Sequence, residues 1–136
     1  MHKKLTAYLS TLEADGFGKW IVDTESRGTV DNPIQMPYVS YSRMVKQFVN
    51  DVYAFADEHQ EYDLYRYNII LAENGIEWDK KSMCEKDVST LGGKCILALI
   101  MGAVRAERFV DGALLNFFRT GTITKWLRRL QEIDET

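Results

Sequence analysis

The clearest place for chemistry in this sequence is a cluster of four charged residues that follows its longest apolar run, residues 96–104. The four are Arg105, Glu107, Arg108 and Asp111. On a helix, Arg108 and Asp111 are three residues apart and Glu107 and Asp111 four apart, so their side chains share neighbouring faces. Such a polar site could bind an anion or a phosphate, with Glu107 or Asp111 as acid or base.

A structural interpretation of this cluster competes with the functional one. Charged groups at the rim of an apolar core need partners, and a bidentate guanidinium–carboxylate pair is the usual arrangement. Neither a histidine, a nucleophile nor a glycine loop stands beside the four residues. We therefore favour an ion-pair network that fixes the junction between two helices, and keep the anion site as the alternative.

A second candidate is the basic C-terminal part of the chain. A short helix, a Gly-containing turn and a second helix with Arg119, Lys125, Arg128 and Arg129 suggest a helix-turn-helix that contacts nucleic acid. Against this, bulky Phe117 stands where that motif prefers a small residue, and the whole chain carries a net charge of −3. A solvated helix face is the simpler interpretation, and nucleic-acid binding is kept as an unlikely alternative.

A third candidate is an aromatic surface. Trp20, Tyr38, Tyr41 and Trp78 lie in or beside segments without helical periodicity. Such rings could line a ligand groove or face a protein partner. They could equally close the ends of a small core, with hydroxyl groups that reach water.

The sequence offers no catalytic residues, no metal site and no cofactor motif. Two cysteines and two histidines match no zinc spacing, and no phosphate loop, dinucleotide fingerprint or nucleophile elbow is present. Cys95 is expected to be a small buried hydrophobe. The nine-residue apolar run is far short of the roughly 20 residues that span a bilayer. We expect a cytoplasmic protein with reduced thiols and no membrane contact, and the case for an enzyme is weak.

These candidates need a scaffold, and the sequence predicts a mainly α fold in a single domain, 1–136. A helix that is apolar on all sides must be covered by neighbours, so a helix over about 89–108 is predicted at the centre. Gly92 and Gly93 would cost roughly 1 kcal/mol each inside it, which indicates close packing against another backbone or a start nearer Lys94. We expect a compact bundle of five to six helices, with a small β-hairpin or irregular flap at 17–41.

Apolar periodicity and capping residues place the other helices. Helices are predicted over 3–14, 42–58, 63–74, 111–119 and 122–133, and residues 79–86 as a loop or one helical turn. Ser42, Asp63 and Thr122 are predicted as N-caps, and Asp87 or Ser89 as the cap of the central helix. Gly16, Gly75 and Gly121 are predicted to end or separate helices.

Two groups of short motifs resemble a known family. They are Met36-Pro37-Tyr38-Val39 with Tyr41-Ser42, and Arg105-Ala106-Glu107-Arg108-Phe109 with Asp111-Gly112, Gly121-Thr122-Ile123 and Leu127-Arg128-Arg129-Leu130. Over roughly 5–133 the chain resembles the small bacterial and phage-associated proteins called domain of unknown function 6508. Ala106 stands where that pattern would have glycine. The resemblance implies a compact, mainly helical cytosolic domain and brings no established activity or catalytic residues.

The leading functional prediction is a non-enzymatic protein-interaction module, an accessory or inhibitor protein with an unknown protein partner, of phage or mobile-element type. Its basis is the weak case for catalysis, the aromatic flap, and an uneven charge distribution, acidic over 51–79 and basic over 105–129. Nucleic-acid binding is the first alternative, and a small-ligand binder or enzyme at the charged cluster is the second. Homodimerisation is compatible with the sequence but not specified by it.

Overall fold

The computed structural model describes residues 2–10, 12, 17–21 and 38–135. Within them the chain is mainly helical, as predicted, and carries a two-stranded antiparallel sheet. The elements are α1 (Lys3–Thr6), η1 (Ala7–Ser10, a 3₁₀ helix), β1 (Gly18–Ile21), β2 (Tyr38–Tyr41), α2 (Arg43–Glu58), η2 (Gln60–Tyr62), η3 (Leu64–Arg66), α3 (Tyr67–Glu73), α4 (Lys80–Glu85), α5 (Gly93–Ala106), α6 (Ala113–Arg119) and α7 (Thr122–Glu135).

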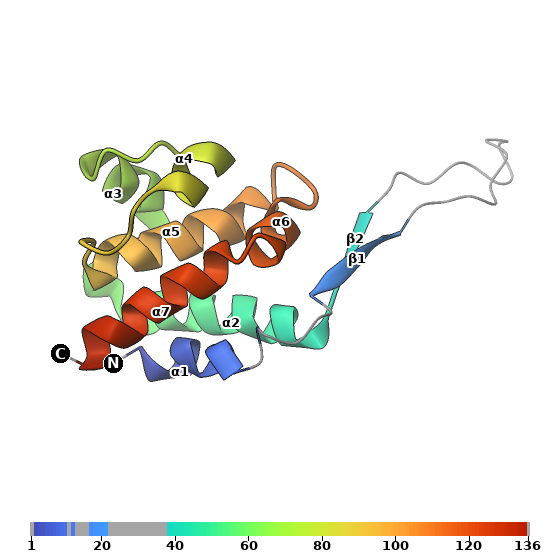
Figure 1. Ribbon diagram of the computed structural model, residues 1–136, viewed down its shortest axis with the longest axis horizontal. Helices are drawn as coiled ribbons and strands as arrows, with labels where there is room; N and C mark the ends of the chain where they lie inside the picture. Colours follow the sequence, from blue (N-terminus) through green and yellow to red (C-terminus); the bar gives the residue numbers. More distant parts are fainter. Residues whose placement is uncertain (1, 11, 13–16, 22–37, 136) are drawn as a thin grey trace, which may run out of the picture.

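Helix α5 is the central helix that the apolar run predicts. All ten residues from Cys95 to Val104 are buried, because α2, α3, α6 and α7 pack around the helix. In Figure 1, α3 and α4 lie on one side of α5 and α1 and α2 on the other, with α7 alongside. A helix without a polar face is stable only when it is enclosed in this way.

The bounds predicted for the central helix, 89–108, are too wide at both ends. The helix begins at Gly93, with Gly92 as N-cap, so Asp87 and Ser89 are not its caps. Asp87 instead accepts a 3.0 Å hydrogen bond from the N–H of Ser89, which closes a local turn. The later start nearer Lys94 is therefore the correct alternative. A Cβ on Gly93 would lie 3.2 Å from the His2 ring, so a side chain rather than another backbone packs there.

Helix α2 has the start and the buried face that its sequence predicts. The Oγ of Ser42 accepts a 3.2 Å hydrogen bond from the N–H of Val45, as expected of an N-cap. The helix buries Val45, Phe48, Val52, Phe55 and Ala56. One side of α2 thus faces the core and the other is left to solvent.

Three other segments differ from their predictions. Asp63 has a left-handed φ of 54° and no capping bond, so a 3₁₀ turn precedes α3, which starts only at Tyr67. Residues 80–85 form a helix, α4, because the Asp79 carboxylate caps it with a 2.7 Å bond from the N–H of Ser82. The predicted helix over 3–14 is α1 followed by η1, and Gly16 lies outside the described residues. With α4 added to the six predicted helices, the described chain has seven α-helices.

The C-terminal elements follow their predicted boundaries closely. Helix α6 begins two residues later than expected. Helix α7 begins at Thr122, so Thr122 is its first residue and not the predicted N-cap. Gly121 between them has a φ of +76°, which suits a sharp turn. Gly75, after α3, has a φ of +71° and ends that helix as predicted.

The alternatives for residues 17–41 are resolved in favour of a hairpin where the chain is described. Strands β1 and β2 pair antiparallel from Gly18 opposite Tyr41 to Ile21 opposite Tyr38. Residues 22–37 lie outside the described residues. The hairpin stands at one end of the helical bundle, next to the start of α2 (Figure 1).

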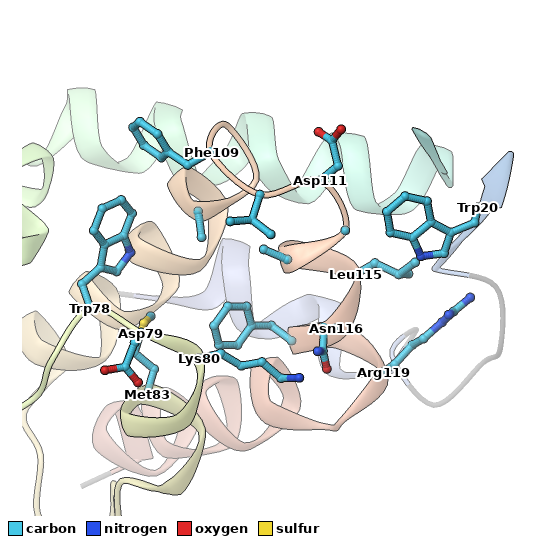
Figure 2. A pocket seen from close by; sticks show the side chains of 15 residues that line it. Trp20, Trp78, Asp79, Lys80, Met83, Phe109, Asp111, Leu115, Asn116 and Arg119 are labelled. Carbon is cyan, nitrogen blue, oxygen red and sulfur yellow. The ribbon is translucent and has the colours of Figure 1, made fainter. Parts of the chain in front are cut away.

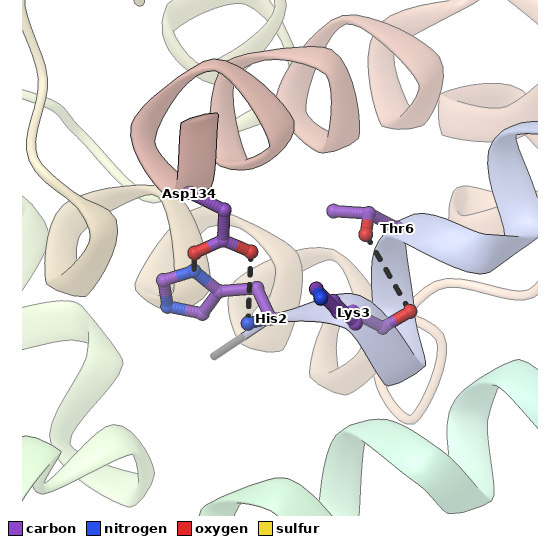
Figure 3. A network of polar contacts seen from close by, with 4 residues as sticks. All are labelled: His2, Lys3, Thr6 and Asp134. Carbon is purple, nitrogen blue, oxygen red and sulfur yellow. Dashed lines mark hydrogen bonds and ion pairs between the residues drawn. The ribbon is translucent and has the colours of Figure 1, made fainter. Parts of the chain in front are cut away.

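The two ends of the chain meet on the other side of the bundle. Both the backbone N–H and the Nδ1 of His2 lie 2.9 Å from carboxylate oxygens of Asp134, near the end of α7 (Figure 3). Only 4% of the His2 side chain and 14% of the Asp134 side chain are exposed. This pair fixes α1 against α7.

Candidate functional site

The predicted charged cluster is split because α5 ends at Ala106. Residues 107–112 form a turn, so the helical spacing expected for Glu107, Arg108 and Asp111 does not occur. None of the four residues forms an ion pair with another described residue, and the predicted guanidinium–carboxylate pairing is therefore wrong for this part of the chain. The turn, rather than the cluster, is held by hydrogen bonds to Glu107 from Tyr41, Gly112 and Leu114.

The Glu107 carboxylate organises the turn. Its Oε1 accepts hydrogen bonds from the Tyr41 hydroxyl at 2.5 Å and from the N–H of Leu114 at 3.0 Å. Its Oε2 accepts from the N–H of Gly112 at 3.0 Å. Charge-assisted bonds of this kind are about twice as strong as neutral ones. Glu107 therefore supports the loop and the first turn of α6.

Tyr41, predicted as part of an aromatic surface, is half-buried and belongs to this network. Its hydroxyl also accepts a 3.0 Å bond from the N–H of Leu115. Burial, followed by the hydrogen bond to Glu107, raises the pKa of Tyr41 well above its ordinary value. The phenol therefore stays protonated and acts as a fixed donor to Glu107.

The four residues of the charged cluster line two different cavities. Arg105, Glu107 and Arg108 line a pocket of about 820 Å³ between α2 and the end of α5, which we call the arginine pocket. Asp111 lines a second cavity of about 780 Å³. The two cavities have no lining residue in common among those described.

The second cavity, which we call the aromatic groove, is walled by Trp20, Trp78, Phe109, Val110 and Phe117. Figure 2 shows Trp20 and Trp78 at its two ends, with Phe109 beside Trp78. Phe109 is 71% exposed and Val110 62% exposed. A contiguous apolar surface of this kind on a small protein commonly marks an interaction site.

Each groove tryptophan is positioned by a glycine. The indole N–H of Trp78 donates a 3.0 Å hydrogen bond to the carbonyl of Gly102 in α5, and a Cβ on Gly102 would lie 3.3 Å from that ring. A Cβ on Gly112 would lie only 2.4 Å from the ring of Trp20. Gly102 and Gly112 thus let both rings lie directly against the backbone.

The structure separates the four predicted aromatic residues. Trp20 and Trp78 line the groove, Tyr41 lines the arginine pocket, and Tyr38 is exposed on β2 outside both cavities. Sequence reasoning missed Phe109 and Val110. The sequence does contain a feature that could have indicated their exposure. Phe109 and Val110 are an apolar pair between Arg108 and Asp111, in a segment whose other residues are polar or small.

Three of the four predicted nucleic-acid contacts donate hydrogen bonds to main-chain carbonyls. Arg119 donates to Gly18 at 3.1 Å, Lys125 to Cys84 at 2.7 Å, and Arg129 to Leu91 at 3.0 Å. Arg128 is exposed on α7. The contact of these residues with nucleic acid stays a prediction.

The cysteines and the acidic residues show no metal-binding arrangement in the described ranges. No three His, Cys, Asp or Glu side chains gather there as a metal would require. Cys84 and Cys95 are both free thiols, and Cys95 is buried as predicted, which raises its pKa. None of the described helices has the length and apolar character needed to cross a membrane.

Comparison with known protein families finds a match over nearly the whole chain. Residues 2–136 match a family described as a family of unknown function, DUF6508. No curated protein and no solved structure matches the chain.

Proposed function

The chain belongs to the family of unknown function DUF6508, and we propose that it is a protein-interaction module whose partner inserts a short apolar segment into the aromatic groove. The observation that carries this proposal is the exposure of Phe109 and Val110 beside two fixed tryptophans. Binding energy in protein interfaces concentrates on aromatic residues in central pockets. The groove offers such a surface.

The rigidity of the groove favours binding. Trp78 is held by Gly102 and lies edge-on to Phe109, with their ring centroids 5.6 Å apart. Trp20 is held against Gly112, whose N–H is in turn bound by Glu107. A surface that is already ordered loses little conformational entropy when a partner binds.

The charges of the groove specify the kind of segment that fits. Asp79 caps α4 and Arg119 donates to the Gly18 carbonyl, so both are engaged. Lys80 and Asp111 have no ion-pair partner among the described residues. A segment with a bulky apolar side chain, flanked by an acidic residue for Lys80 and a basic residue for Asp111, matches this arrangement. The groove volume of about 780 Å³ holds a few side chains of such a segment.

The lining of the groove supports binding rather than catalysis. No described residue that lines it is a serine, cysteine or histidine. The hydrogen bond from the N–H of Ser82 lowers the pKa of Asp79, which makes this carboxylate a poor proton donor. The module acts as an accessory or inhibitor protein by binding a segment of its partner. The two free thiols support a cytoplasmic location.

Selection from a random peptide library tests the proposal directly. We expect the enriched peptides to share a bulky apolar residue with an acid on one side and a base on the other. The double variant Phe109→Ser/Val110→Ser should lose these peptides. Ile69→Ser is the matched control, because Ile69 is 48% exposed on α3 and does not line the groove. This variant should bind as the unaltered protein does.

Charge reversal gives the second arm of the experiment. Asp111→Lys should shift the selection away from peptides with a basic flank, and Lys80→Glu away from those with an acidic flank. Enrichment of peptides without an apolar residue, or equal binding to the double variant, would refute the proposal.

A further inference from the structure

The arginine pocket gathers positive charge from two segments of the chain. Lys46, Asn50 and Tyr53 lie on one face of α2, since they are spaced by four and three residues. Arg105 and Arg108 face them from the end of α5 and the turn that follows. These three cations converge without an ion-pair partner in the described part of the chain.

One carboxylate lines the same pocket, and it is already engaged. Glu107 accepts hydrogen bonds from Tyr41, Gly112 and Leu114, which disperse its charge. Lys46, Arg105 and Arg108 therefore outnumber the negative charge of the pocket. Unpaired like charges repel each other in a partly enclosed space, and a bound anion removes that repulsion.

Two tyrosine side chains lie beside the guanidinium of Arg105. A hydrogen bond with Tyr53 raises the pKa of its guanidinium, and Tyr67 adds to this effect. The Nε of Arg105 is buried and has no hydrogen-bond partner. The Arg105 side chain as a whole is only partly buried and lines the pocket. A guanidinium binds the oxygens of phosphate or carboxylate in pairs.

The walls of the pocket extend beyond what a simple ion needs. Its volume of about 820 Å³ is that of a site for a small organic molecule. Val45, Val49 and Leu114 give it an apolar side, and the rings of Tyr53 and Tyr65 stack with centroids 6.4 Å apart. We propose that the arginine pocket binds a small phosphate monoester, with its dianionic group at Arg105, Arg108 and Lys46 and its organic part against the valines and tyrosines.

This site is separate from the aromatic groove, because the two share no lining residue among those described. Phenyl phosphate is a suitable probe, since it combines a dianion with one aromatic ring. Titration calorimetry at low ionic strength should show saturable binding. Inorganic phosphate, which lacks the ring, and benzoate, a monoanion, should each bind about tenfold more weakly. Added salt should weaken all three interactions.

Two exposed cations provide the test variants. Arg108→Gln and Lys46→Gln should each lower the affinity for phenyl phosphate about tenfold, which corresponds to one charge-assisted contact. Arg108→Lys should restore part of the affinity. Lys81→Gln is the matched control, because Lys81 is exposed on α4 outside the described pockets. It removes the same charge and should leave binding unchanged.

Methyl signals of Val45, Val49 and Leu114 in NMR spectra should shift on titration with phenyl phosphate and thereby place the ligand. The proposal is overturned if phenyl phosphate does not saturate the protein, or if Arg108→Gln binds it as tightly as the unaltered chain. It is also overturned if benzoate or inorganic phosphate matches phenyl phosphate.

Discussion

The Tyr41 hydroxyl donates a 2.5 Å hydrogen bond to Oε1 of Glu107, a residue 66 positions later in the chain. This bond joins the hairpin to the turn that ends α5. The same turn presents Phe109 to the aromatic groove and Arg108 to the arginine pocket. Both proposed sites therefore depend on one carboxylate and its fixed donors.

Removal of the Tyr41 hydroxyl should destabilise the protein. Tyr41→Phe deletes the donor to Glu107 and leaves the N–H of Leu115 without its acceptor. We expect a loss of about 1–3 kcal/mol in the free energy of unfolding, measured with urea. Tyr38→Phe, which removes a hydroxyl from an exposed ring on the same strand, should cost little. Equal stability of the two variants would show that the network contributes nothing.

Gly112→Ala should disturb the hairpin as well as the backbone. Gly112 has a φ of +87°, and a Cβ there would lie 2.4 Å from the Trp20 ring. Gly121→Ala is the matched control, since Gly121 has a φ of +76° and no atom within 4 Å of its Cβ position. Backbone strain alone costs roughly 1–2 kcal/mol.

We expect Gly112→Ala to cost more than Gly121→Ala in urea unfolding and to change the fluorescence of Trp20. Trp20→Phe combined with Gly112→Ala should recover part of the difference. If the two alanine variants are equally stable and have the same fluorescence, Trp20 does not pack on Gly112 in solution.

The sequence predicted the parts of the fold that depend on neighbouring residues. The run from Cys95 to Val104 is apolar on every side and lies at the centre. Ser42 has the side chain of an N-cap, and Gly121 the freedom for a left-handed turn. In each case the structure follows from the type of the residue itself or of its neighbours along the chain.

The candidate sites depend on contacts that sequence spacing does not contain. Glu107 was expected to pair with an arginine on a continuing helix, but its donors are Tyr41 and the main-chain groups that follow the turn. The turn over residues 107–112 also exposes Phe109. Lys46 joins Arg105 only because α2 packs against α5. No residue spacing in the chain predicts that approach.

The pair between His2 and Asp134 should make stability depend on acid pH. Burial raises the pKa of the Asp134 carboxyl, but the hydrogen bonds from His2 outweigh it, and the pKa lies below its ordinary value. The unfolded chain, with an aspartate pKa of about 3.9, therefore binds protons that the folded chain does not. The stabilisation is present above that value and is lost as the pH falls through the folded pKa.

Asp134→Asn should lower the free energy of unfolding at neutral pH by about 1–3 kcal/mol. It should also flatten the decline of stability between pH 5 and pH 2, roughly the range set by such carboxyl groups. Glu135→Gln, which alters the adjacent exposed residue, is the control. An unchanged acid profile in Asp134→Asn would mean that His2 does not hold this carboxylate in solution.

Lys125 separates a structural role of the basic C-terminal residues from nucleic-acid binding. Its Nζ donates to the carbonyls of Cys84 at 2.7 Å and Lys86 at 3.4 Å, which ties the end of α4 to α7. We expect Lys125→Gln to lower the free energy of unfolding by about 1–2 kcal/mol. Any weak affinity for duplex DNA at low salt should stay the same as in Lys81→Gln, which removes an equal charge.

A direct contact between Lys125 and a DNA phosphate would give the opposite pattern. Lys125→Gln would then keep its stability, bind DNA more weakly than Lys81→Gln, and reduce the slope of log affinity against log salt by about 1.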